Sequence, residues 1–225
     1  MGKFLRFIGI LFLGLTAAFT LLGGAGTVCV SINAEKYASM VGLVPYKWLY
    51  WIFTILTTAV GVMGIRAIIN LLKGKTGAYM FTIITLILGI VTGVIRMGAS
   101  RALRGKSMPI DMVVYTTVIT LIIFLLFKIP SVWEKVDFER KHRKEGDTAG
   151  GAAAIVMGIL CLTIHVWMGP THTWGGINYA DAFNTVMNFT GWGLVTFGTG
   201  IMTRSIIKAA FVQPHKELKS SGIIA

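Results

Sequence analysis

The chain has 225 residues, of which 55% are hydrophobic and only 13% are charged, and its mean hydropathy is +0.74. A soluble domain of this size carries about 25% charged residues, so the composition excludes an ordinary water-soluble fold. The net charge of +12 does not indicate nucleic acid as a partner, because basic residues in a membrane protein flank the segments that cross the bilayer.

Six long apolar stretches joined by short segments make up most of the chain. Each is close to the roughly 20 residues that cross a 30 Å hydrocarbon layer. Backbone polar groups in lipid must be satisfied within their own segment, and the alternation of barrel strands is absent, so we expect helices. The sequence predicts an all-α integral membrane protein, a bundle of about six transmembrane helices in one domain over residues 1–212. The expected spans are residues 7–22, 48–72, 76–95, 109–127, 151–168 and 182–203.

Flanking residues mark the ends of several spans. The first span follows Lys3 and Arg6, and we expect it to be retained because no clean signal-peptide cleavage site follows it. The third span comes after a basic turn at residues 73–75, and Pro109 suits the first turn of the fourth. Gly169 and the proline after it end the fifth span.

The distribution of Lys and Arg predicts the orientation. With the N-terminus inside, fifteen of these residues lie on inner segments and six on outer ones. This bias predicts that both the N- and C-termini are cytoplasmic, in a multi-pass protein of the cell membrane. Four of the six exceptions belong to one loop between the third and fourth spans, namely Arg96, Arg101, Arg104 and Lys106.

Two further features belong to the inner side. Ser131 and Glu134 form a capping box, and oppositely charged residues follow at i, i+4 spacing. We therefore expect a cytoplasmic interfacial helix over residues 131–145, which lies along the anionic inner leaflet. Residues 213–225 form a polar C-terminal tail.

The basic outer loop is the first candidate site. If the third helix continues past residue 95, Arg96, Ser100 and Arg104 share one face, with Arg101 beside it. Together with Lys106 they would dock an acidic partner or anionic lipids. The alternative is a solvated helix end whose long side chains reach the interface.

A segment rich in His and Trp after the fifth span is the second candidate site. It places His165, Trp167, His172 and Trp174 at the outer face. One interpretation is a shallow pocket for a quinone head group, a haem edge or a metal, with a histidine as donor or ligand and the tryptophans as walls. A bis-histidine haem needs two facing histidines at similar depth, and no other span offers one. The alternative is an interface loop anchored by tryptophans.

Small residues four apart predict close helix packing. The pairs are Gly89/Gly93, Ala154/Gly158 and Thr196/Gly200, and such spacing lets helices approach closely in lipid, within the chain or against another subunit. No expected span has a carboxylate, Lys or Arg at its middle. This counts against ion-coupled transport, which normally uses such a group.

The sequence leaves three functions open. It contains no phosphate loop, nucleophile elbow, zinc-spaced cluster or nucleotide fingerprint, so we expect no catalytic activity. The preferred function is a non-catalytic multi-pass membrane subunit or scaffold of a larger complex, with the lipid bilayer and other membrane subunits as partners. The alternatives are a redox-linked subunit that binds quinone or haem, and a small passive transporter or channel.

Overall fold

Within the residues that the structure describes, the secondary structure is helical apart from one hairpin of two-residue strands, β1 (Thr173–Trp174) and β2 (Ile177–Asn178). The computed structural model describes residues 2–36, 38–136, 138, 143–169, 173–174, 176–178, 181 and 184–220. The α-helices are α1 (Gly2–Asn33), α2 (Lys47–Leu72), α3 (Ala78–Arg104), α4 (Ile110–Leu126), α5 (Pro130–Val136), α6 (Arg143–Leu162), α7 (Ile164–Trp167) and α10 (Asn184–Ser220). Two 3-10 helices, η1 (Ala34–Lys36) and η2 (Ala38–Tyr46), join α1 to α2.

Three helical segments within the described residues are long and apolar enough to cross a membrane, judged by length and composition. They are Gly2–Ile32, Met40–Leu72 and Ala78–Arg104. The pair α4 and α5, bent by 98°, makes a fourth if it counts as one span, and Thr148–Leu162 is a shorter apolar helix. The all-helical class is thus confirmed, with three to four helices of this kind.

Several helix bounds differ from the expected spans. α1 continues through the glycine-rich residues 23–26 to Asn33, and α10 continues to Ser220, into the segment expected to be a polar tail. α6 ends at Leu162, and Thr163 separates it from α7. Of the surface helix expected over residues 131–145, the structure describes α5 and the start of α6; residues 139–142 lie outside the described part.

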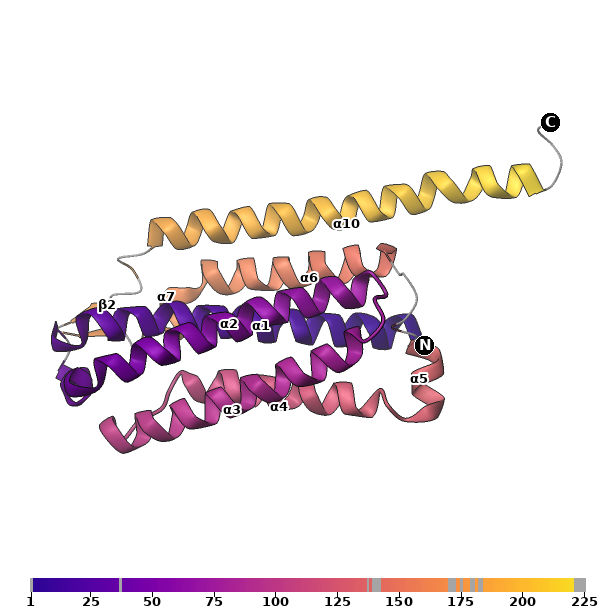
Figure 1. Ribbon diagram of the computed structural model, residues 1–225. Coiled ribbons are helices and arrows are strands. Elements are labelled where there is room, and N and C mark those ends of the chain that lie inside the picture. Colours follow the sequence, from indigo (N-terminus) through magenta and orange to yellow (C-terminus); the bar gives the residue numbers. More distant parts are fainter. Residues whose placement is uncertain are drawn as a thin grey trace.

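α1 lies at the centre of the fold. It packs against α2, α4 and α6, while α3 packs against α2 and α4. α6 connects this group to α10, which lies beyond it and extends past the rest of the bundle toward the C-terminus (Figure 1). The end with Gly2, the α2–α3 turn and α5 is called the N-terminal end, and the end with η1, η2 and the α3–α4 loop is called the loop end.

An aromatic cluster closes the N-terminal end. Phe124 and Phe138 are buried and stack with ring centres 5.7 Å apart. Arg6 of α1 is also buried, donates a hydrogen bond to the Val136 carbonyl and lies 6.0 Å from the centre of the Phe138 ring. Lys128 Nζ lies 4.3 Å from the centre of the Trp133 ring. The contacts of Arg6 attach α5 and Phe138 to the start of α1. Both cation–ring distances are in the range that stabilises such pairs.

Hydroxyl side chains fill much of the interior between α1, α2, α3 and α4. Most of them donate to the carbonyl one turn back in their own helix, as Thr20 does to Thr16 and Thr82 to Ala78. Because a buried hydroxyl is costly only when it lacks a partner, these bonds let polar side chains lie inside an apolar bundle. Other hydroxyls join two helices: Thr16 Oγ1 of α1 lies 2.7 Å from Thr120 Oγ1 of α4, and the Tyr50 hydroxyl of α2 lies 3.0 Å from Ser100 Oγ of α3.

Candidate functional site

The cavity among these interior hydroxyls is small. It is lined by residues of α1, α2, α3 and α4, including Thr16, Thr20, Thr85 and Thr117, and its volume is about 10 Å³. A cavity needs about this much space to hold one water molecule. Among the described residues this interior therefore resembles a packed core with room for about one water.

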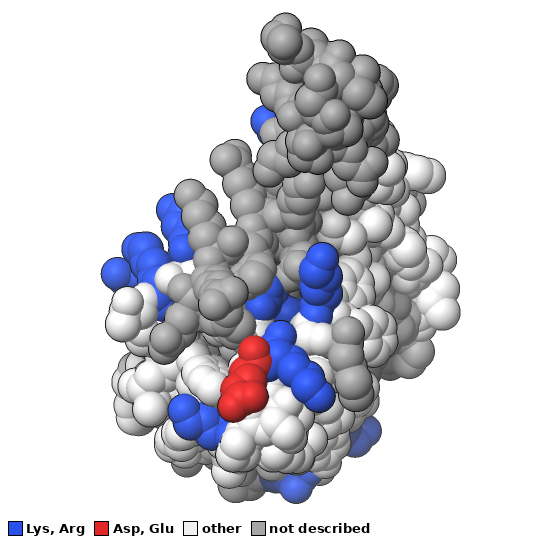
Figure 2. Space-filling view, turned by 90° about the vertical axis from the view of Figure 1, so that its right-hand side faces the viewer, with Lys and Arg blue, Asp and Glu red and all other residues white. Residues whose placement is uncertain are grey.

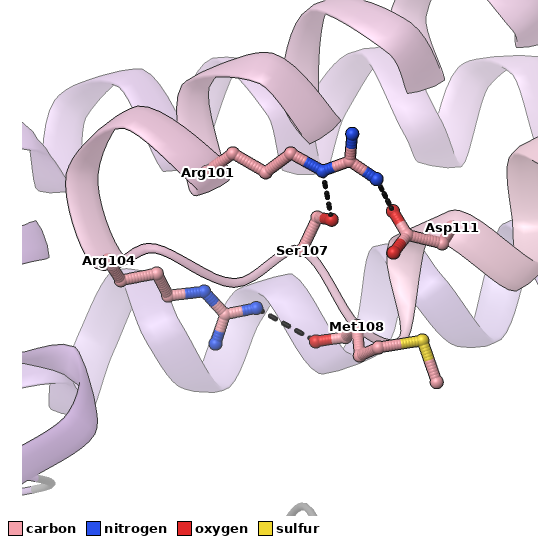
Figure 3. A network of polar contacts seen from close by, with 5 residues as sticks. All are labelled: Arg101, Arg104, Ser107, Met108 and Asp111. Carbon is pink, nitrogen blue, oxygen red and sulfur yellow. Dashed lines mark hydrogen bonds and ion pairs between the residues drawn. The ribbon is translucent and has the colours of Figure 1, made fainter.

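The basic loop between α3 and α4 folds back on itself (Figure 3). Arg101 Nε donates to Ser107 Oγ at 2.8 Å, and its Nη2 lies 3.4 Å from Asp111 Oδ1. Arg104 Nη2 donates to the Met108 carbonyl at 2.8 Å. Arg101 and Arg104, two of the four predicted docking residues, therefore hold the loop closed. Arg101 and Lys106 are exposed to the surroundings.

Arg96, another predicted docking residue, lies inside the bundle. Because α3 continues to Arg104, this side chain falls within the helix, and only 9% of its surface is exposed. It faces Gly23 of α1, where an added Cβ would lie 3.7 Å from Arg96 Nη1. Arg96 is therefore separated from the exposed members of the basic group.

A second ion pair lies at the loop end. Lys47 Nζ donates to Glu35 Oε1 at 2.6 Å and to the Ile32 carbonyl at 3.1 Å, and so joins the end of α1 to the start of α2. The hydrogen bond from Lys47 lowers the pKa of the Glu35 carboxyl below its usual 4.5. The Glu35 side chain is 53% exposed, so this ion pair contributes little to stability.

The second predicted site is described only in part. His165 lies exposed on α7, and its carbonyl accepts a hydrogen bond from Asn178 Nδ2 of β2 at 3.2 Å. Trp167 and Trp174 lie in α7 and β1, but their side chains, like the whole of His172, are outside the described part. Within the described residues no three His, Cys, Asp or Glu side chains are grouped to hold a metal ion. The predicted pocket, with His165 or His172 as donor or ligand, stays a prediction.

Two of the three small-residue pairs are filled within the chain. A methyl group on Gly93 would lie 2.7 Å from Val114 Cγ2 of α4, so this pair serves the contact between α3 and α4. A methyl group on Gly158 would lie 2.6 Å from the Gly191 carbonyl of α10, and one on Gly198 would lie 2.5 Å from the Gly151 carbonyl of α6. α6 and α10 thus approach with their backbones almost in contact.

The third small-residue pair, Thr196/Gly200 of α10, is not covered by another described helix. No heavy atom of the described residues lies within 4 Å of a Cβ added at Gly200 or at Gly193. Thr196 and Gly200 instead line a shallow, widely open groove along one flank of α10, formed by residues of that helix alone. The groove is completed by Trp192, Val195, Thr199, Thr203, Arg204 and Ile207. The sequence contained the spacing of this pair, but it could not show which pairs the chain fills itself.

The sequence matches no protein-family model, and no curated protein or solved structure matches it either. Function therefore has to be inferred from the geometry of the chain itself.

Proposed function

We propose that the protein is a non-catalytic multi-pass membrane subunit, with about six spans and both termini in the cytoplasm. Large apolar side chains cover its exterior: Ile55 of α2 is 66% exposed, Ile95 of α3 58% and Phe189 of α10 84%. Apolar surface on this scale is unfavourable in water but suits contact with lipid. The bilayer of a cell membrane is therefore the proposed environment.

The charges at the N-terminal end support the proposed orientation. Lys and Arg side chains are spread over this end with little acidic surface among the described residues (Figure 2). They include Lys73 and Lys75 of the α2–α3 turn, Lys128 just before α5 and Lys135 within α5. Basic residues of short loops stay on the cytoplasmic side, so the N-terminal end is the proposed inner face.

The open groove on α10 carries the proposal of a subunit role. Motifs of the same kind at Gly93 and Gly158 are closed by helices of this chain, whereas the Thr196/Gly200 pair faces outward. Small residues allow another helix to approach closely in lipid. The proposed occupant is a transmembrane helix of another subunit, and the exposed Arg101 and Lys106 add a basic contact for anionic lipids at the outer face.

Purification in mild detergent tests this proposal. A partner protein should accompany the wild-type chain in fixed stoichiometry, as measured by mass spectrometry of the intact complex. Gly200→Leu should lose the partner, because the side chain fills the groove. Thr190→Leu places the same side chain on an exposed position outside the groove and should keep it.

The same preparation separates the proposed role from the alternatives. A wild-type chain that purifies alone, as a monomer, would contradict the subunit role. A complex that contains only copies of this chain would show that the groove on α10 binds a second copy of the chain and not a helix of another protein. A haem absorbance band lost in His165→Ala would favour the redox-linked alternative instead.

A further inference from the structure

Arg96 is a buried cation for which the described residues supply no anion. Its Nε is buried and makes no hydrogen bond, and the side chain as a whole is 9% exposed. The hydroxyl of Ser100, one turn further along α3, is already paired with the Tyr50 hydroxyl at 3.0 Å. A cation taken out of water without a partner is costly, and within a span it normally marks a functional site.

The carboxylates at the loop end are engaged elsewhere. Glu35 pairs with Lys47, and Asp111 pairs with Arg101. Neither of these ion pairs includes Arg96. Among the described carboxylates at this end, none therefore compensates its charge.

A second arginine lies on the same face of α3. Arg104 is two turns beyond Arg96, and Ser100 lies between them. The Arg104 Nε is also buried without a hydrogen bond, although its Nη2 is held by the Met108 carbonyl (Figure 3). Arg104 is half-buried and ends α3 next to the α3–α4 loop, whereas Arg96 lies deeper and is buried. These two arginines of α3 thus each have a buried Nε–H that the described residues leave without a hydrogen bond.

We propose that Arg96 and Arg104 form a binding site for a phosphate group, reached from the loop end of the bundle. Guanidinium groups bind phosphate oxygens with paired, charge-assisted hydrogen bonds, which few other ligands satisfy as well. The phosphate is that of a free inorganic anion or of a lipid head group, which have the same binding chemistry. This site is independent of the α10 groove and goes beyond the subunit role.

Thermal unfolding of the delipidated full-length chain in detergent tests the site. Inorganic phosphate, compared with chloride at equal ionic strength, should raise the melting temperature by about 5 °C or more at about 100-fold over its Kd. In a parallel arm, phosphatidylglycerol is compared with a phosphate-free glycolipid. A shift with inorganic phosphate identifies a free anion, and a shift with phosphatidylglycerol alone identifies a lipid phosphate; either supports the proposal.

Substitutions test whether the two arginines cause the rise in melting temperature. Arg96→Met should abolish the shift and Arg104→Gln should reduce it, whereas Lys36→Gln removes an exposed charge at the same end of the bundle and should leave it unchanged. Without phosphate, Arg96→Met should melt at or above the wild-type temperature, because it removes an uncompensated charge. If Arg96→Met does not fold, Arg96→Lys keeps the charge without the planar fork and should weaken phosphate binding about tenfold.

Two results would overturn the proposal. One is a wild-type chain that neither phosphate nor phosphatidylglycerol stabilises beyond its control. The other is a shift of wild-type size in both Arg104→Gln and the Arg96 variant that folds.

Discussion

At the scale of single residues, the bond between Thr16 and Thr120 is the clearest polar link between two helices. Its oxygens lie 2.7 Å apart, and both residues are buried. In Thr16→Val the shape is kept and the hydroxyl is lost, while Thr120 still bonds the Thr116 carbonyl at 2.8 Å. No polar group is left unpaired, so the free energy of unfolding should fall by only about 1 kcal/mol.

Unfolding in detergent measures this difference. Thr199→Val is the matched control, because Thr199 is exposed on α10 and bonds only the carbonyl of Val195 in its own helix. It should have almost no effect. Equal effects of the two substitutions would show that the bond between α1 and α4 adds nothing to stability.

The Glu35–Lys47 pair predicts a pH dependence at the loop end. The folded-state pKa of Glu35 is lowered, so the unfolded chain binds its proton more readily. The contribution of the pair is therefore fully present above the ordinary pKa of 4.5 and is lost as the pH falls through the lower folded-state value. Glu35→Gln should remove this part of the acid sensitivity, as measured by unfolding between pH 6 and pH 3. An unchanged acid profile in Glu35→Gln would contradict the prediction.

At the scale of elements, the contact between α6 and α10 depends on glycine. In Gly198→Ala the new methyl group would lie 2.5 Å from the Gly151 carbonyl, and backbone atoms cannot move aside as a flexible side chain does. We expect a loss of about 1–3 kcal/mol in the free energy of unfolding. Gly193→Ala, in the same helix, meets no described atom within 4 Å and should be neutral or slightly stabilising.

An engineered disulfide between α6 and α10 tests the same helix contact directly. Thr148 Oγ1 and Ser205 Oγ lie 3.5 Å apart, so cysteines at these two positions should oxidise readily in a chain whose Cys29 and Cys161 are replaced by alanine. Gly198→Ala should slow this oxidation and Gly193→Ala should not. If Gly198→Ala leaves the rate of disulfide formation unchanged, α6 and α10 do not approach each other closely at Gly198.

The helices were predictable from sequence because each apolar stretch is longer than its connecting segments. α2 over residues 47–72 and α4 over residues 110–126 run through the apolar stretches identified at 48–72 and 109–127. The environment of Arg96 was not predictable, because apolar content alone suggested that the third span ended at residue 95. The helix continues with polar and small residues, and Arg96 is buried where α3 faces Gly23 of α1. Hydropathy measures preference for lipid and carries no information about burial against other helices.

At the scale of the whole molecule, the fold consists of a group formed by α1 to α4 and an outlying pair of α6 and α10. α1 is the link, since it contacts α6 as well as α2 and α4. The chain closes the inner faces of the first group with its own side chains but leaves one side of α10 open. A helix attached to its own chain on one side only is well placed to join two subunits, which is why the proposed partner contact lies there.

The proposed orientation predicts which ends of α3 face each side of the membrane. α3 spans residues 78–104 and is about 40 Å long, and its flanking lysines Lys75 and Lys106 are both exposed. In a chain whose native cysteines are replaced by alanine, Lys106→Cys should react with a membrane-impermeant thiol reagent in intact cells. Lys75→Cys should react only after the membrane is permeabilised. Each substitution removes one positive charge, so the comparison is matched. The opposite pattern would reverse the orientation, and reaction of both cysteines in intact cells would show that α3 does not cross the membrane.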